Sequence, residues 1–207
     1  MAPNASLSPL SSVSLHDEQV AIGPLMPEDS ASLFLWFNDI DAANLDLAFR
    51  PMDWTAFQTW LGEVARNTSR VFFAIRNVSQ PAIVGYLALS NINAIHRSAE
   101  LGIRIGSAGN RGKGYGRAAI KLALKYAWQN LNLQRVQLSV FAHNERAIRS
   151  YLASGFEEEG RLVRAAFIDG KWADVVIMAA LRPEEFAAIA HRHHVTKEAH
   201  VEFAGRA

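Results

Sequence analysis

Apolar residues recur every three or four positions in several stretches of this chain, and this period predicts helices. The first stretch starts with a proline followed by acids, which favours a helix start. The stretch from residue 114 is the longest and has one clear apolar face. The predicted helices are Pro27–Asp39, Asp53–Arg66, Gly114–Asn130, Asn144–Ser154 and Pro183–Ala190.

Shorter apolar runs with β-branched and aromatic residues separate these helices and predict strands. Turn residues separate the first four strands, which indicates an antiparallel meander, and Asp169–Gly170 favours a tight hairpin between the last two. The predicted strands are Val20–Leu25, Val71–Ile75, Ile83–Asn91, Ser98–Ile105, Val136–Phe141, Phe156–Phe167 and Trp172–Leu181. This order predicts a mixed α/β domain with one central sheet.

Length and composition favour one domain with appended ends. The chain has 207 residues, of which 50% are hydrophobic, enough for one sizeable core. We expect an N-terminal arm over residues 1–18, rich in Ser, Pro, Asn and Ala, and a globular domain over residues 19–182. Residues 183–207 are expected to form a C-terminal helix and a polar tail.

Charge and cysteine content exclude several classes of protein. A net charge of +1 provides no overall field to attract nucleic acid or an anionic membrane, and the absence of cysteine excludes disulfides and thiolate chemistry. No apolar run reaches the length of a membrane span, and the N-terminus lacks a signal-peptide pattern. We therefore expect a cytoplasmic protein. The cluster His191, His193 and His194 lies in the polar tail, so we expect solvated side chains and no metal site.

The segment Asn110–Arg117, with the sequence NRGKGYGR, predicts a phosphate-binding loop. Glycine allows left-handed backbone that turns successive N–H groups toward one point, where the following helix also directs its positive N-terminal end. The glycines are Gly112, Gly114 and Gly116, with Tyr115 between the last two. Arg111, Lys113 and Arg117 add positive charge that suits an anion of two phosphates.

Three kinds of nucleotide loop compete for this segment, beside an ordinary glycine-rich turn. A Walker loop would need a serine or threonine after the lysine, and a dinucleotide loop would need an acid on the next strand. Neither requirement is met, because a glycine follows Lys113 and the next strand reads RVQLSVF. The loop R/Q-x-x-G-x-G/A of GCN5-related N-acetyltransferases matches at Arg111, Gly114 and Gly116.

From Arg97 to Leu181 the chain resembles this acetyltransferase family, and most closely its branch of spermidine and ribosomal-protein N-terminal acetyltransferases. The segments that carry the resemblance are HRSAELGIRIG, NRGKGYGRAAI, LNLQRVQLSVFAHNERAIRSYLASGFEEEG and FIDGKWADVVIMAAL. The resemblance implies a mostly antiparallel sheet of six to seven strands, splayed between the fourth and fifth, with four to five flanking helices. It also implies acetyl-CoA as co-substrate, without a metal.

The resemblance implies that acetyl-CoA lies in the gap between the fourth and fifth strands. Its pantetheine arm would pair with the main chain of Ile103, Arg104 and Ile105, as an added strand would, and its pyrophosphate would lie on the glycine loop. Asn144 would contact the pantetheine region, although an N-cap of the following helix is an equally ordinary role for an asparagine.

Tyr151 and Glu100 are the candidate catalytic residues. Tyr151 lies seven residues after Asn144, on the same helix face, where family members place a tyrosine whose hydroxyl faces the CoA sulfur. It would act as general acid toward the departing thiolate, and its alternative role is core packing on Ile148 and Leu152. Glu100 would act as general base toward the acceptor ammonium, and its alternative role is an ion pair with an arginine at 97 or 104.

The resemblance also indicates where the acceptor amine would bind. In the family the two first helices wall the acceptor site, and Asp39, Asp41 and Asp46 form an acidic patch near it that is sparser than in the spermidine enzymes. We expect direct acetyl transfer to a primary amine, either a peptide N-terminus or a small amine such as an amino sugar or amino acid. A polyamine acceptor and a non-catalytic acyl-CoA-binding module remain alternatives. The exposed edge of the last hairpin and the long chain ends favour a homodimer.

Overall fold

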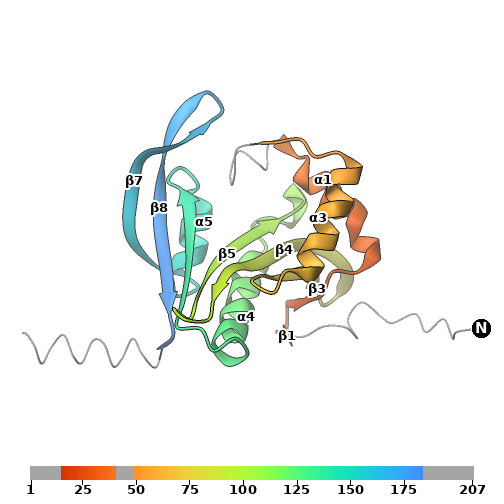
Figure 1. Ribbon diagram of the computed structural model, residues 1–207, viewed down its shortest axis with the longest axis horizontal. Helices are drawn as coiled ribbons and strands as arrows, with labels where there is room; N and C mark the ends of the chain where they lie inside the picture. The colour runs from red at the N-terminus through yellow and green to blue at the C-terminus, as the bar shows by residue number, and fades with distance from the viewer. Residues whose placement is uncertain (1–14, 41–48, 184–207) are drawn as a thin grey trace, which may run out of the picture.

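The computed structural model describes residues 15–40 and 49–183. These residues build one eight-stranded sheet with the strand order β1-β2-β3-β4-β5-β6-β8-β7, in which all neighbours are antiparallel except β5 and β6 (Figure 1). The strands are β1 Leu15–His16, β2 Val20–Gly23, β3 Val71–Asn77, β4 Gln80–Asn93, β5 Ser98–Ile105, β6 Arg135–Phe141, β7 Glu157–Ile168 and β8 Lys171–Leu181. The predicted mixed α/β class is confirmed.

The strand count exceeds the predicted six to seven because Leu15–His16, within the predicted arm, pairs with β2. Strand β4 is also longer than predicted, since β3 on one side and β5 on the other extend its pairing. The turn at Asp169–Gly170 has the predicted form, with positive φ at both residues.

Helices cover both faces of the sheet. They are η1 Pro27–Asp29, α1 Ser30–Phe37, α3 Trp54–Arg66, η2 Ala108–Asn110, α4 Tyr115–Gln129 and α5 Glu145–Leu152. The first predicted helix is therefore split into a 3₁₀ turn and a shorter α-helix, and Asp53 caps α3 by accepting a hydrogen bond from the Ala56 amide. Figure 1 shows α1 and α3 on one side of β5, and α5 beside β8 on the other.

The main core lies between α4 and one face of the sheet. In β5 the side chains of Ala99 and Leu101 are buried in this core, whereas Glu100 and Gly102 are exposed on the opposite face. Arg104 follows Gly102 on that opposite face, and its guanidinium donates a hydrogen bond to the carbonyl oxygen of Trp36 in α1, at 2.8 Å. The face of β5 that carries Glu100, Gly102 and Arg104 is therefore the face of α1 and α3.

Strands β5 and β6 pair over only three residues before they separate. The register joins Ser98 to Arg135, Ala99 to Val136 and Glu100 to Gln137, and no pairing follows. The main chain of β5 from Leu101 onward consequently has an open edge toward β6. This is the splay between the fourth and fifth predicted strands, and it forms a wedge in the middle of the sheet.

Several sequence predictions fall outside the described residues: Asp41, Asp46, the helix after Pro183 and the cluster His191, His193 and His194. Within the described ranges, no helix is long and apolar enough to cross a membrane.

Candidate active site

The glycine loop between β5 and α4 has the backbone that the sequence predicts. Gly112 and Gly114 have φ values of +80° and +88°, a left-handed conformation that disfavours side chains. Gly114 is also the N-cap of α4, and no side chain caps this helix. The first-turn amides of α4 therefore keep their hydrogen-bonding capacity for a ligand at the positive end of the helix.

Arg111, which the sequence predicts to contact a phosphate, also makes hydrogen bonds within the protein. Its guanidinium donates hydrogen bonds to the carbonyl oxygens of Ile105, at 3.3 Å, and Gly106, at 3.0 Å, and lies 4.0 Å from Asp39. The side chain thus joins the end of β5 to the start of the loop. It lines the cavity described below, and two of its five N–H donors, on Nε and Nη2, form hydrogen bonds within the protein.

The other loop side chains line two cavities, and Tyr115 lines both. Lys113 lines a small polar cavity of about 290 Å³ on the other side of the loop, and its carbonyl oxygen accepts a hydrogen bond from the Gln19 side chain at 3.0 Å. Tyr115 is 9% exposed, and its hydroxyl accepts a hydrogen bond from the side-chain amide of Asn77 in β3 at 2.8 Å. This contact fixes the loop to the sheet, whereas Arg117 lines the larger cavity.

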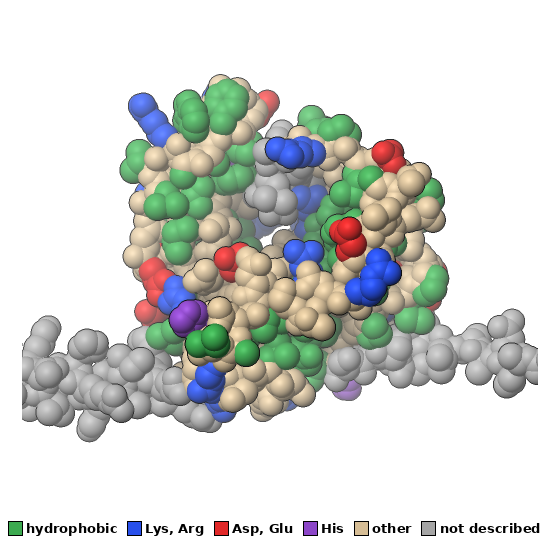
Figure 2. Space-filling model, viewed as in Figure 1, with side chains coloured by type: hydrophobic (Ala, Val, Ile, Leu, Met, Phe, Trp, Pro, Cys, Tyr) green, Lys and Arg blue, Asp and Glu red, His purple; other side chains and the backbone are tan. Residues whose placement is uncertain are grey.

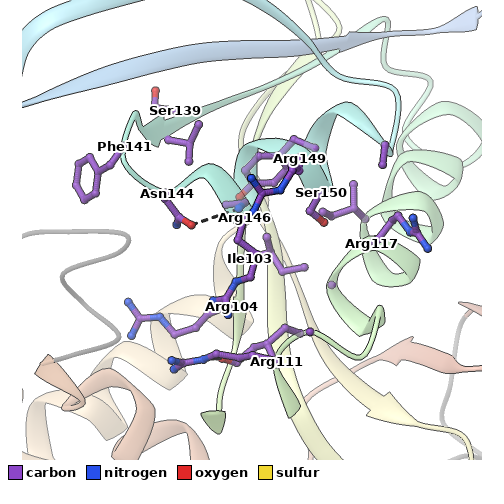
Figure 3. A pocket seen from close by; sticks show the side chains of 18 of the residues that line it. Ile103, Arg104, Arg111, Arg117, Ser139, Phe141, Asn144, Arg146, Arg149 and Ser150 are labelled. Carbon is purple, nitrogen blue, oxygen red and sulfur yellow. Dashed lines mark hydrogen bonds between the residues drawn. The ribbon is translucent and has the colours of Figure 1, made fainter. Parts of the chain in front are cut away.

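A cavity of about 780 Å³ follows the wedge from the glycine loop to the hairpin β7–β8 (Figure 3). One wall is the open part of β5, Ile103 to Ile105, and the other is the end of β6, where Ser139 and Phe141 lie. Figure 2 shows basic side chains beside the hollow between the two halves of the molecule. The cavity suits an extended ligand with an anionic end.

Arg146 and Arg149 also line this cavity, and sequence analysis missed them. Both lie on α5, and Figure 3 shows them near the centre of the cavity, with Arg117 to one side on α4. Their spacing of three residues places both on one helix face, which is a signal that the sequence contained. Together with Arg117 they give the cavity three exposed cations from two helices.

Asn144 and Tyr151 lie at the two ends of the same helix and both line the cavity. The Asn144 side chain caps α5 by accepting a hydrogen bond from the Ala147 amide at 3.2 Å, the dashed line in Figure 3. Tyr151 is 9% exposed, and its ring packs against Phe156 with 5.7 Å between ring centroids. Phe156 is therefore a buried neighbour of the Tyr151 ring. Leu152, which the sequence predicted as a packing neighbour, is half exposed.

Glu100 lies at the point where β5 and β6 separate, just outside the residues that line the cavity. Its two carboxylate oxygens accept hydrogen bonds from the side-chain amides of Asn91, at 2.9 Å, and Gln137, at 3.4 Å. Asn91 provides its contact from a left-handed backbone conformation with φ of +53°. Amides from both neighbouring strands therefore hold the exposed carboxylate in place.

Ion pairs elsewhere on the sheet are structural. The Arg135 guanidinium hydrogen-bonds to both carboxylate oxygens of Glu159, and this contact lowers the pKa of Glu159 and raises that of Arg135. The Glu159 side chain is therefore paired, although it is 40% exposed. Within residues 15–40 and 49–183, no three His, Cys, Asp or Glu side chains gather as metal ligands would.

Comparisons with known proteins agree with this geometry. A family model described as acetyltransferase (GNAT) domain matches residues 19–157. Spermidine N(1)-acetyltransferase of Vibrio cholerae is 41% identical over 104 residues, which are 50% of this chain and 60% of that protein. The Escherichia coli ribosomal protein uS5-alanine N-acetyltransferase is 27% identical over 65% of this chain and 69% of that protein.

Solved structures extend the similarity to most of the described chain. The crystal structure of Vibrio cholerae spermidine N-acetyltransferase in complex with CoA and spermine has a TM-score of 0.73 and 28% identity, covering 80% of this chain and 96% of that one. Another structure of that enzyme is described as dodecameric. The sequence alignments are shorter, and this chain spans 60% and 55% of the Vibrio cholerae and Escherichia coli spermidine relatives.

Proposed function

This chain belongs to the GNAT acetyltransferase family, and from this membership we propose that it is an enzyme that transfers acetyl from acetyl-CoA to a primary amine. The observation that carries the proposal is the cavity in the wedge between β5 and β6, which reaches from a glycine loop with two left-handed glycines to Tyr151. A ligand with a diphosphate at one end and a thioester at the other fits this arrangement of groups.

The donor would be held by main chain at one end and by charge at the other. The first-turn amides of α4 would bind the pyrophosphate, and Arg117, Arg146 and Arg149 would add charge-assisted contacts to its phosphates. The open edge of β5 would pair with the amides of the pantetheine arm. Bound in this way, acetyl-CoA supplies an activated acetyl group.

Two proton transfers would be carried out by residues of the protein. The acceptor ammonium must lose a proton before its nitrogen attacks the carbonyl carbon, and we assign this proton to Glu100 directly or through a water. The C–S bond then breaks, and the Tyr151 hydroxyl, at the cavity wall, would protonate the departing thiolate. The chain contains no cysteine, which fits direct transfer without an acyl-cysteine intermediate.

The relatives of this chain differ in the class of amine that they acetylate. Spermidine acetyltransferases of Vibrio cholerae and Escherichia coli are among them, which supports a polyamine, and an alanine N-terminal acetyltransferase is another, which supports a peptide. We propose a peptide N-terminus or a small amine, with spermidine or spermine as the alternative. A non-catalytic acyl-CoA-binding module is the competing class of function, and self-association into at least a dimer is part of the proposal.

Calorimetric titration with acetyl-CoA, followed by thiol release in the same sample, tests the proposal. We expect micromolar binding and CoA release that depends on an added amine from a panel of peptides, amino sugars, amino acids and polyamines. Binding without release from any amine would favour the acyl-CoA-binding module, and the absence of binding would refute both. Light scattering that shows a monomer at all concentrations would exclude the dimer.

A further inference from the structure

Gly102 occupies the middle of β5, a central strand, without a structural requirement for glycine. Its φ is not positive, and a Cβ added there would meet no atom of the described residues within 4 Å. A glycine inside a strand loses more conformational entropy on folding than other residues and contributes no side-chain packing. The residue therefore weakens the strand without relieving any crowding in the described structure.

At two nearby positions, Gly85 and Gly106, the fold does require glycine, because an added Cβ would clash. A Cβ at Gly85, on the neighbouring strand β4, would lie within 3.0 Å of the backbone carbonyl oxygen of Arg104. A Cβ at Gly106, just after β5, would overlap the indole ring of Trp36. Both positions, near the C-terminal end of β5, exclude a side chain by close approach, whereas Gly102, opposite Ala88 in the middle of the strand, does not.

The surface around Gly102 consists of small residues on the face that carries Glu100. Ala88 of β4 pairs directly with Gly102. Across the wedge, Gln137 pairs with Glu100, so Ser139, two residues further along β6, has its side chain on the same face. Gly102 and Ser139 are both exposed. Small side chains on three adjacent strands thus leave open space beside the carboxylate that we assign as general base.

Aromatic side chains border this open space on the side of α1 and α3. Tyr86, two residues before Ala88 on the same face, stacks on Phe37 at 5.3 Å and on Phe72 at 5.2 Å between ring centroids. Trp60 of α3 contacts Phe72 edge-on at 5.5 Å. An apolar group that lay over Gly102 would rest against this row of rings.

We propose that Gly102 selects the acceptor by leaving room for a substituent on the carbon that bears the amine. The α-amine of a peptide has such a branch, its side chain, in addition to the continuing main chain. The primary amines of a polyamine sit on unbranched methylene carbons and need no such room. The inference rests on the proposed acetyltransfer and narrows its acceptor to an α-branched amine, the N-terminus of a peptide.

The test compares Gly102→Ala with wild type on three acceptors: a peptide that begins with alanine, the same peptide beginning with glycine, and spermidine. The two peptides differ only in the branch. One methyl group in a recognition site changes kcat/KM by roughly tenfold or more, and we expect a loss of this size for the alanine peptide alone. The melting temperature should stay unchanged or rise, because alanine restricts the unfolded chain and meets no obstacle in the fold.

Gly160→Ala is the matched control, since Gly160 is also a strand glycine with nothing within 4 Å of an added Cβ among the described residues, and lies on the outer strand β7. This substitution should leave kcat/KM unchanged for all three acceptors. An equal loss on all three acceptors with Gly102→Ala would overturn the inference, as would a wild-type enzyme that acetylates spermidine but neither peptide. In the latter case the proposed function stands, whereas absence of acetyl-CoA binding or of CoA release with every acceptor removes both.

Discussion

Replacement of Arg111 by alanine should destabilise the protein and weaken acetyl-CoA binding only indirectly. The guanidinium donates to the carbonyl oxygens of Ile105 and Gly106, at 3.3 and 3.0 Å, from a side chain that is 20% exposed. Hydrogen bonds that involve a charged group contribute about 1.5–3 kcal/mol each, and the longer bond lies at the weak end. With the longer bond counted at about 1.5 kcal/mol, we therefore expect a loss of about 3–4 kcal/mol in unfolding free energy.

For a domain of this size, where 1 kcal/mol corresponds to about 2–4 °C, that loss corresponds to a fall of about 6–16 °C in melting temperature. Thermal unfolding of the Arg111→Ala variant checks this value, and calorimetry with acetyl-CoA follows at a temperature where the variant is folded. We expect acetyl-CoA affinity to fall by about tenfold, since the loop would lose its fixed position and part of its preorganisation.

Arg117→Ala is the matched control, because Arg117 lines the same cavity from an exposed position on α4. It should lose acetyl-CoA affinity in a salt-dependent manner, with a melting temperature close to that of wild type. If Arg111→Ala instead kept the wild-type melting temperature and lost affinity, Arg111 would be a direct phosphate ligand, and the anchoring role would be wrong.

Three further predictions follow from single contacts. Tyr151→Phe should lower kcat by about 10²–10⁴ while acetyl-CoA affinity stays nearly unchanged, and an unaltered kcat in steady-state assays would remove Tyr151 as general acid. Gly85→Ala should cost about 2 kcal/mol or more in denaturant unfolding, because the added Cβ meets the Arg104 carbonyl oxygen, and a stable variant would contradict this crowding. Since the hydrogen bond from Arg135 lowers the pKa of Glu159, this pair stabilises the fold above the ordinary value of 4.5 and loses that effect as the pH falls through the lower folded value. Melting temperatures of Glu159→Gln and wild type should differ at neutral pH and converge once the pH lies below that lower value, and a difference that persisted in strong acid would have another cause.

Local features of the sequence were sufficient to predict most elements and part of the site. Periodicity placed every predicted strand and four of the five predicted helices within a few residues of their observed bounds, and the fifth lies almost wholly outside the described residues. The loop glycines and the cap at Asn144 were also predictable, because left-handed backbone and an N-cap depend only on nearby residues. The hydrogen bonds of the Arg111 guanidinium were not predictable in this way, because its acceptors are backbone carbonyl oxygens at the end of β5, and the path of the folded loop brings the side chain to them.

The family resemblance implied where the sheet opens, but tertiary structure alone decided how far β5 and β6 pair and what surrounds each glycine. In the sequence Gly85, Gly102 and Gly106 are the same residue in strand-like surroundings. In the fold, a carbonyl oxygen crowds the first, an indole ring crowds the third, and the second faces open space beside Glu100. These differences arise from contacts between segments far apart in the chain, such as α1 against the end of β5, and from strands that pair for three residues before they part. Local propensity contains no information about such contacts, and the wedge and the proposed acceptor space beside it depend on them.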